Sequence, residues 1–222
     1  MKENYQRQLE QILEEVSLWD RTPTLLLHSC CAPCSTYVLD YLSAYFDITV
    51  YYYNPNIYPA AEYAFRAQEQ EALVQRMETP KPLHFLAAPY EPETFYNLVR
   101  GHEGDPERGA RCSLCYQMRL EETARRAQEG GFDFFTTTLS ISPHKDAARL
   151  NAIGRALAER YQVRYLYSDF KKRDGFLRST QLSARYGIYR QDYCGCLFSY
   201  QARQAQEGGD KKVSKTEVGE DK

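Results

Sequence analysis

Short apolar runs alternate with longer segments of helical periodicity along most of this chain, and this alternation constrains the fold more than any other feature. Parallel strands need a crossover connection, which is usually a helix, so the alternation predicts a mostly parallel sheet. We therefore expect a three-layer α/β fold with helices on both faces of the sheet. The expected strands cover residues 25–28, 48–53, 83–87, 133–138 and 163–167. The expected helices between them cover residues 34–45, 60–78, 92–100, 112–131 and 145–160.

The chain has a different character at each end of this alternation. Residues 1–22 predict a separate N-terminal helix, at about residues 4–18, with one apolar face. Residues 23–200 predict a single α/β catalytic domain, which ends in a less regular, helical segment at 168–200 that is rich in basic and aromatic residues. The stretch 201–222 is charged and lacks an apolar period, so it predicts a disordered tail.

The location of the protein follows from what the sequence lacks. No run approaches the roughly 18 apolar residues of a membrane span, and the polar N-terminus has no signal-peptide core. We expect a cytoplasmic protein without a membrane partner. In that reducing compartment, seven cysteines favour metal or redox chemistry over a framework of structural disulfides.

The end of the first expected strand carries cysteines where a phosphate-binding loop would carry glycines. The first glycine of the chain is Gly101, which excludes a glycine-rich phosphate loop from the first two strand–helix units. Cys30, Cys31 and Cys34 stand there instead, with Pro33 suited to the first turn of the following helix. The partial positive charge of a helix N-terminus stabilises thiolates.

A second pair of cysteines, Cys112 and Cys115, has the Cys-x-x-Cys spacing at the start of a long helix. Together with Cys30 and Cys31 it supplies four thiolates, a set that fits either tetrahedral zinc or an iron–sulfur cluster. The two pairs are far apart in sequence and both lie at the predicted sheet edge, which favours a catalytic cluster. Structural zinc is the main alternative, and Cys34 has no assigned role.

A third pair, Cys194 and Cys196, is separated by one glycine. Cysteines at this spacing can close a small, strained disulfide ring, and such disulfides are often the redox-active ones. The alternative is that both thiols bind the metal.

Two further positions follow expected strands. Ser142 is a plausible helix N-cap with Pro143 in the first helical turn, and His144 and Lys145 beside it suggest either an anion site or simply a capped helix with solvated charges. His144, Lys145 and Asp192 are also candidate proton donors. His28, at the end of the first strand, is more typical of a hydrogen-bonded structural histidine than of a ligand. The pair Glu62 and Arg66, four residues apart, is consistent with a surface ion pair.

Residues 164–190 interleave basic and aromatic side chains, although the formal net charge of the whole chain is only -2. Basic residues contact phosphates and aromatic residues stack on unpaired bases, so this segment suggests single-stranded or looped RNA as a partner. The alternative is a helical hairpin with a solvated basic face.

The motifs taken together resemble the QueH-type epoxyqueuosine reductase family between about Leu25 and Ser199. The matching stretches are LLLHSCCAPCS, YYNPNIYPAAEY, RCSLCYQMRL, TTTLSISPHKD and the segment that ends in YRQDYCGCLFS. The resemblance implies an oxidoreductase that completes queuosine biosynthesis by removing the epoxide oxygen of epoxyqueuosine at the wobble position of tRNA. It also implies a fold similar to the HUP-type nucleotide-binding proteins.

The resemblance implies site residues as well. Cys30, Cys31, Cys112 and Cys115 match the ligands of a [4Fe–4S] cluster, and Cys194 and Cys196 match a redox-active disulfide. No cobalamin-binding signature is visible. The sequence leaves open a second, mononuclear metal ion beside the cluster, the oligomeric state and the identity of the electron donor.

Two other functions are compatible with parts of the same pattern. A zinc-stabilised RNA-binding module without catalysis uses the same cysteines. An ATP-dependent tRNA thiolation enzyme of related fold needs a phosphate-binding loop near the first strand, which the absence of early glycines argues against.

Overall fold

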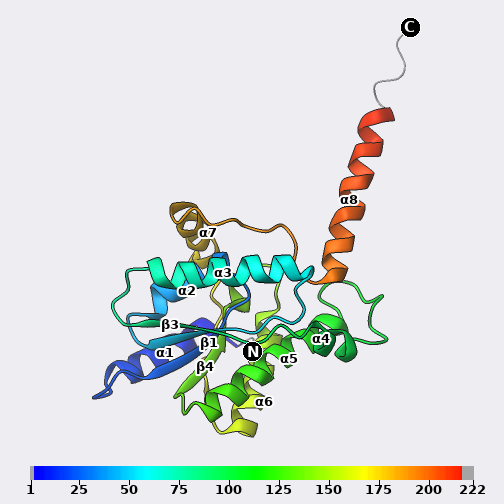
Figure 1. Cartoon of the computed structure of the whole chain (residues 1–222). Coiled ribbons are helices and arrows are strands. Elements are labelled where there is room, and N and C mark those ends of the chain that lie inside the picture. Colours follow the sequence, from blue (N-terminus) through cyan, green and yellow to red (C-terminus); the bar gives the residue numbers. More distant parts are fainter. Residues whose placement is uncertain (1–2, 217–222) are drawn as a thin grey trace.

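The computed structural model describes residues 3–216, and side chains for residues 3–206 (Figure 1). Its strands are β1 (Thr24–His28), β2 (Asp47–Tyr52), β3 (Leu83–Ala87), β4 (Phe134–Thr137) and β5 (Arg164–Tyr165). Its helices are α1 (Tyr5–Ser17), α2 (Ala32–Leu42), α3 (Ala60–Arg76), α4 (Pro92–Leu98), α5 (Ala110–Glu129), α6 (Ala147–Tyr161), α7 (Gly175–Arg185) and α8 (Leu197–Thr216). A short 3-10 turn, η1, covers Thr138–Ile141.

The five strands form one parallel sheet in the order β3-β2-β1-β4-β5, which confirms the expected fold class. β1 lies at the centre, and its side chains Leu25, Leu26 and Leu27 are fully buried. A central parallel strand is covered on both faces, which explains why it reads as a continuous apolar run. The chain leaves β1 for β2 on one side and later returns to β4 on the other. The carboxyl ends of β1 and β4 therefore flank the switch point, where such sheets bind ligands.

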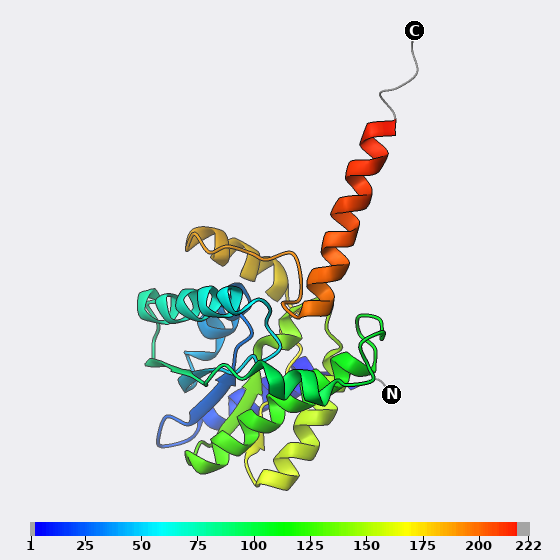
Figure 2. The same ribbon diagram turned by 45° about the vertical axis from the view of Figure 1, so that its right-hand side comes forward.

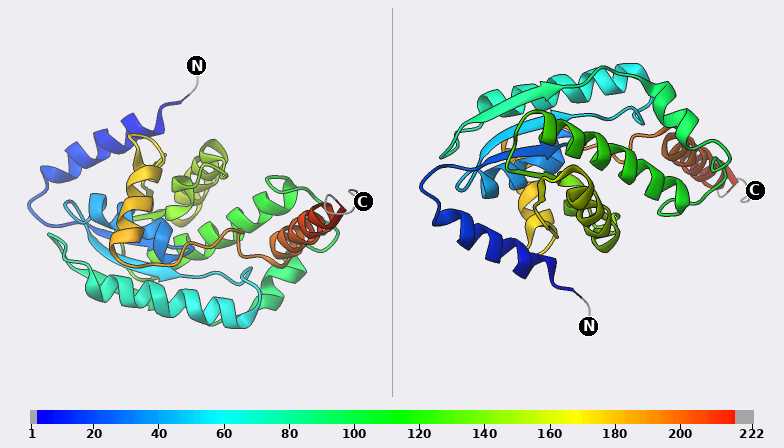
Figure 3. Two further views of the ribbon diagram at one scale, coloured as in Figure 1. Left: turned by 90° about the horizontal axis from the view of Figure 1, so that it is seen from above. Right: turned by 90° about the horizontal axis from the view of Figure 1, so that it is seen from below.

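Two apolar clusters cover the two faces of the sheet. Leu25 and Leu27 pack with residues of α1, α2 and α3, whereas Leu26 packs with residues of α5 and α6 on the other face. This division follows the two-residue repeat of a strand. The view from above shows α1 and α3 toward opposite edges of the sheet (Figure 3).

Two local predictions were wrong. Ser142 does not begin a helix: it follows η1, and Asp146 caps α6 by accepting a hydrogen bond from the Arg149 backbone at 3.1 Å. The chain is also helical from Leu197 to Thr216, where a disordered tail was predicted from residue 201. α8 extends away from the body of the protein (Figure 2). Residues 217–222 lie outside the described residues.

None of the helices in the described part of the chain combines the length and apolar character that a membrane crossing requires.

Candidate metal and thiol centre

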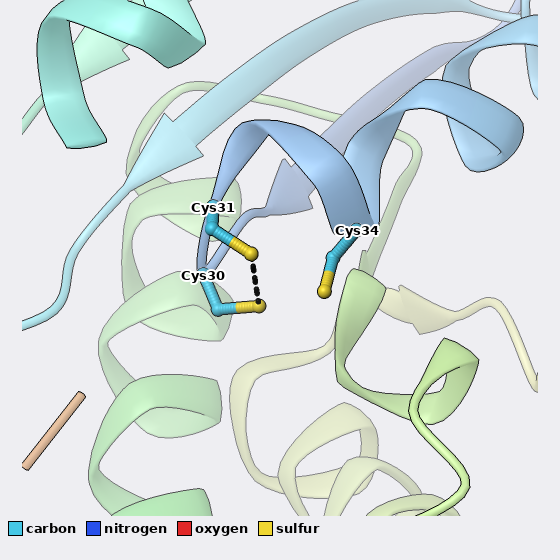
Figure 4. A group of neighbouring side chains, drawn as sticks. All are labelled: Cys30, Cys31 and Cys34. Atoms are coloured by element: carbon cyan, nitrogen blue, oxygen red, sulfur yellow. Dashed lines mark hydrogen bonds between the residues drawn. The ribbon is translucent and has the colours of Figure 1, made fainter. Parts of the chain in front are cut away.

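Three cysteines converge where β1 ends and α2 begins. Cys31 is the N-cap residue of α2, with Pro33 in its first turn as predicted, and Cys30 and Cys34 stand on either side. The three Sγ atoms lie within 4.8 Å of one another, and those of Cys30 and Cys31 are 3.7 Å apart (Figure 4). Thiol ligands at such spacing could hold a metal ion. The structure thus groups Cys34, to which the sequence assigned no role, with the adjacent pair Cys30 and Cys31.

The three thiols of this group differ in pKa. Hydrogen bonds from Cys31 and Cys34, together with the nearby charge of Arg119, hold the pKa of Cys30 well below its usual value. The hydrogen bond to Cys30 raises the pKa of Cys31 to about 12. Of the three thiols, Cys30 therefore loses its proton most readily.

Cys112 and Cys115 lie on the first turns of α5, as predicted. Cys112 packs against the same apolar cluster as Cys30, and its Sγ accepts a hydrogen bond from the Arg108 backbone at 3.3 Å. Cys115 is buried beside Phe95, and burial raises the pKa of its thiol to about 11. In this structure neither sulfur is among the closely spaced group formed by Cys30, Cys31 and Cys34.

A cavity of about 650 Å³ joins the three sulfur groups. Six of the seven cysteines line it: Cys30, Cys31, Cys34, Cys112, Cys194 and Cys196. The cavity opens at the carboxyl edge of the sheet, so thiols from three distant parts of the chain face one space, as the sequence predicted.

The Cys194-Gly195-Cys196 loop is fixed against the loop that follows β2. The Tyr58 backbone donates to the Gly195 carbonyl at 2.7 Å, and the Tyr193 hydroxyl donates to the Tyr58 carbonyl at 3.0 Å. Gly195 has φ +108°, and a Cβ there would lie 3.0 Å from Arg66 Nη1. Glycine is therefore required by conformation as well as by space. Both cysteines are free thiols here.

Lys145 reaches the same loop from the segment before α6. Its Nζ donates to Cys194 Sγ at 2.8 Å and lies 5.8 Å from the centroid of the Tyr116 ring. Burial alone would lower the pKa of Lys145, but its interactions with Cys194 and Tyr116 outweigh burial, so the pKa is raised. The ammonium group is thus held next to the thiol as a charged partner.

Two buried arginines flank the tandem cysteines. Arg66 and Arg119 are each 2% exposed, and the Nη2 atom of each has no hydrogen-bond partner within the described part of the chain. Arg119 Nη1 donates to Asn54 Oδ1 at 3.4 Å, and its charge acts on Cys115, Cys194 and Cys30. Gln70 Nε2, one turn from Arg66 on α3, is a third buried donor without a partner. Buried N–H groups are rarely left unpaired, so this excess of donors points to an absent acceptor.

Little in the sequence pointed to these buried cations. Glu62 and Arg66 do form an ion pair, at 2.7 Å, but the Arg66 side chain is only 3% exposed, so it is not the surface pair that was expected. Arg119 was not singled out at all. Its position four residues after Cys115, on the same side of α5, was the available signal.

His28 has the structural role expected of it. Its Nε2 donates to the Tyr53 carbonyl at 3.1 Å, so Nδ1 accepts from the Thr137 hydroxyl at 2.9 Å. Burial, with the charge of Arg119, lowers the pKa of His28 to about 3. The imidazole is therefore neutral and fully hydrogen-bonded.

His144, unlike His28, lines the cavity, and its Nδ1 accepts a hydrogen bond from the Arg108 side chain at 3.1 Å.

The basic and aromatic segment 164–190 is not one continuous basic strip. Arg164, Arg173 and Arg178 form ion pairs with Glu15, Glu10 and Asp40, and Lys171 pairs with Asp169. Arg190 and Phe176, by contrast, line the cavity beside the cysteines.

Known proteins match the chain over most of its length. The family model described as "Epoxyqueuosine reductase QueH" matches residues 25–202. Relatives named Epoxyqueuosine reductase QueH include one from Streptococcus pyogenes, 43% identical over 203 residues, covering 89% of this chain and 78% of the relative. Another, from Staphylococcus epidermidis, is 43% identical over 205 residues, covering 89% and 85%. A third, from Thermotoga maritima, is 34% identical over 182 residues, covering 79% and 90%.

Proposed function

Because this chain belongs to the QueH family of epoxyqueuosine reductases and is an oxidoreductase, we propose that it reduces epoxyqueuosine at the wobble position of tRNA to queuosine. The observation that carries the proposal is the single cavity lined by six thiols beside two buried arginines. We propose the cytoplasm as the location of the reaction, where tRNA is available as substrate.

The electron count of the reaction matches a dithiol. An epoxide that loses its oxygen to leave an alkene takes up two electrons and two protons and releases water. Cys194 and Cys196 give up two electrons and two protons when they close a disulfide, which an external electron donor must then reduce. Both thiols line the cavity, so they can act close to a nucleotide bound there.

We further propose that Lys145 assists this dithiol, both by its charge next to Cys194 and by donating a proton during the reaction. Its Nζ lies 2.8 Å from Cys194 Sγ, so the ammonium group is placed to stabilise negative charge that develops on this sulfur during the reaction. The ammonium group is also a proton donor for the departing epoxide oxygen. Cys194 is then the sulfur that reacts first, and Cys196, whose thiol is kept protonated because burial raises its pKa, is the resolving sulfur.

The cavity suits a negatively charged metal–sulfur group. We propose a [4Fe–4S] cluster held by Cys30, Cys31, Cys112 and Cys115, with Cys34 as an additional candidate ligand. Such a cluster would supply electrons one at a time. Arg66 and Arg119 line the cavity, and their unpaired Nη2 atoms are donors that sulfur acceptors of such a group can satisfy.

The decisive experiment is anaerobic incubation of the iron- and sulfide-reconstituted protein with tRNA that carries epoxyqueuosine and a strong reductant. Nucleoside mass spectrometry should show epoxyqueuosine replaced by queuosine, and Cys194→Ser should show no conversion. Full conversion by Cys194→Ser would exclude the dithiol step, and no conversion by the loaded wild-type protein would contradict the reaction itself.

Metal content separates the cluster from a zinc site, since four thiolates suit both. Anaerobically purified protein should contain iron and acid-labile sulfide and absorb near the visible wavelengths typical of [4Fe–4S] proteins. Stoichiometric zinc without sulfide would favour the zinc-stabilised module instead.

A further inference from the structure

An exposed aromatic patch borders the cavity. Seven large apolar or aromatic residues are exposed among the described residues, and four of them lie on α3, α7 and the segment that follows α7. These are Phe65 (45% exposed), Phe176 (39%), Leu177 (56%) and Tyr189 (55%). We call Phe65, Phe176, Leu177 and Tyr189, together with Arg190, the aromatic platform.

The platform is held in place although it is exposed. The rings of Phe65 and Tyr189 meet edge to face at 6.2 Å between centroids, and the Tyr189 backbone donates to Glu69 on α3 at 3.0 Å. The Arg190 guanidinium lies over the Phe176 ring at 5.4 Å. These contacts join α3, α7 and the segment 186–196, which runs from α7 along α3 to the base of α8 (Figures 1 and 2).

Arg190 brings an uncompensated positive charge to the platform. Its Nη1 donates to the Ser179 carbonyl at 3.3 Å and to the Ser183 hydroxyl at 3.0 Å, and both partners are neutral. Within the described residues no carboxylate forms an ion pair with it, in contrast to Arg164, Arg173 and Arg178. An arginine fixed by neutral groups and stacked on a ring can receive an anion or stack on a planar base.

The platform is continuous with the proposed reaction site. Phe176 and Arg190 line the same cavity as Cys30, Cys31, Cys34 and Cys194. A nucleotide inserted among these cysteines therefore leaves its chain neighbours at the platform. Exposed aromatic faces next to an arginine without a carboxylate partner suit unpaired bases and their phosphates, and less well a peptide of acidic side chains, which offer no rings to stack.

We propose that the aromatic platform stacks the unpaired bases next to the modified nucleotide of the tRNA anticodon loop. This inference rests on the proposed function and adds the surface that holds the loop. Phe176 and Tyr189 supply the stacking faces, and Arg190 contacts the adjacent phosphate. The ion-paired basic residues of segment 164–190 contribute less, because carboxylates already neutralise them.

Binding of RNA to the purified protein, without any cluster chemistry, tests this proposal. The probe is a fluorescein-labelled anticodon stem–loop RNA, with 2-aminopurine next to the wobble position in a second version. Phe176→Ala and Tyr189→Ala should each raise the Kd about fivefold to 150-fold and reduce the quenching of 2-aminopurine on binding. Arg190→Ala should lower the salt dependence of log Kd by about one, whereas the two aromatic variants should leave it unchanged.

Leu18→Ala is the matched control, since Leu18 is 85% exposed and follows α1, away from the cavity. It should bind the RNA like wild type. Phe176→Ala, Tyr189→Ala and Leu18→Ala should keep the wild-type Tm, because exposed side chains contribute little to stability.

The outcomes separate this proposal from the proposed function. Wild-type Kd and quenching in Phe176→Ala and Tyr189→Ala would overturn the platform, even if the loaded enzyme reduces tRNA. Failure of wild type to bind the stem–loop while it binds an acidic peptide would overturn it too. A loaded wild-type enzyme that binds RNA on the platform without reducing it would contradict only the function.

Discussion

The two edges of the same sheet are built in opposite ways. At the amino edge, Asp133 accepts hydrogen bonds from Arg21 at 2.7 Å and from the Thr24 backbone at 2.8 Å, and its own backbone donates to Thr24 Oγ1 at 3.1 Å. At the carboxyl edge, three thiols lie within 4.8 Å and buried arginines keep unpaired donors. A polar group that is satisfied within the chain contributes to stability. An unsatisfied buried group destabilises the protein unless a ligand completes it.

This contrast predicts that substitutions at the carboxyl edge change activity, metal content or the potential of the bound centre, and that substitutions at the amino edge change stability alone. The following predictions test that division, from the largest effect to the smallest.

Cys112→Ser should lose the iron and sulfide of the reconstituted protein and abolish turnover, because the four-thiolate set is then incomplete. Iron analysis, the visible spectrum and nucleoside mass spectrometry measure the effect. Cys34→Ser is the informative comparison: unchanged iron content would exclude Cys34 as a ligand. A colourless but active Cys112→Ser protein would refute the cluster assignment.

Lys145→Met should slow the reaction about tenfold to a hundredfold and leave the iron content unchanged. It should also slow alkylation of Cys194 by iodoacetamide at neutral pH, because the thiolate loses its 2.8 Å cationic partner. Lys145→Arg keeps the charge and should restore much of the alkylation rate. Equal alkylation rates in all three proteins would show that Lys145 does not support the thiolate.

Arg119→Met should shift the potential of the loaded centre by on the order of 50–100 mV to more negative values, because a buried positive charge favours the reduced, more negative state. Spectroelectrochemical titration measures this shift. Arg21→Met, at the other edge, is the matched control and should leave the potential unchanged. A potential that moves equally in both variants would contradict a local role for Arg119.

Asp133→Asn should lower the free energy of unfolding at pH 7 by about 1 kcal/mol, a value discounted for its partial exposure, and leave turnover unchanged. The hydrogen bond from Arg21, against some desolvation, lowers the pKa of Asp133 from 3.8 to about 2. Its contribution is therefore present above pH 4 and is lost as the pH falls toward 2. Denaturant titrations above pH 4 and near pH 2 should show that the difference in free energy of unfolding between wild type and variant disappears in acid.

Much of the fold could be predicted because apolar runs mark its strands and helical periodicity marks several of its helices. β1 is apolar along its length since both of its faces are covered, and helical periodicity marks α1, α3 and α5. The error at Ser142 had a local cause, because the turn η1 follows β4 directly and delays the next helix to Ala147. The helical backbone of 197–216 has no apolar repeat, so periodicity could not predict it.

The candidate site could be predicted only in part. The sequence alone determined that sulfur replaces a phosphate-binding loop at the first strand, because residue type and short-range spacing are local properties. It also determined that the three cysteine groups follow elements that end at one edge. Only the tertiary structure decided that Cys34 joins Cys30 and Cys31, that Lys145 contacts Cys194, and that Arg66 and Arg119 are buried beside them. Such contacts depend on how helices far apart in the chain pack on the sheet, and spacing along the sequence does not fix that packing.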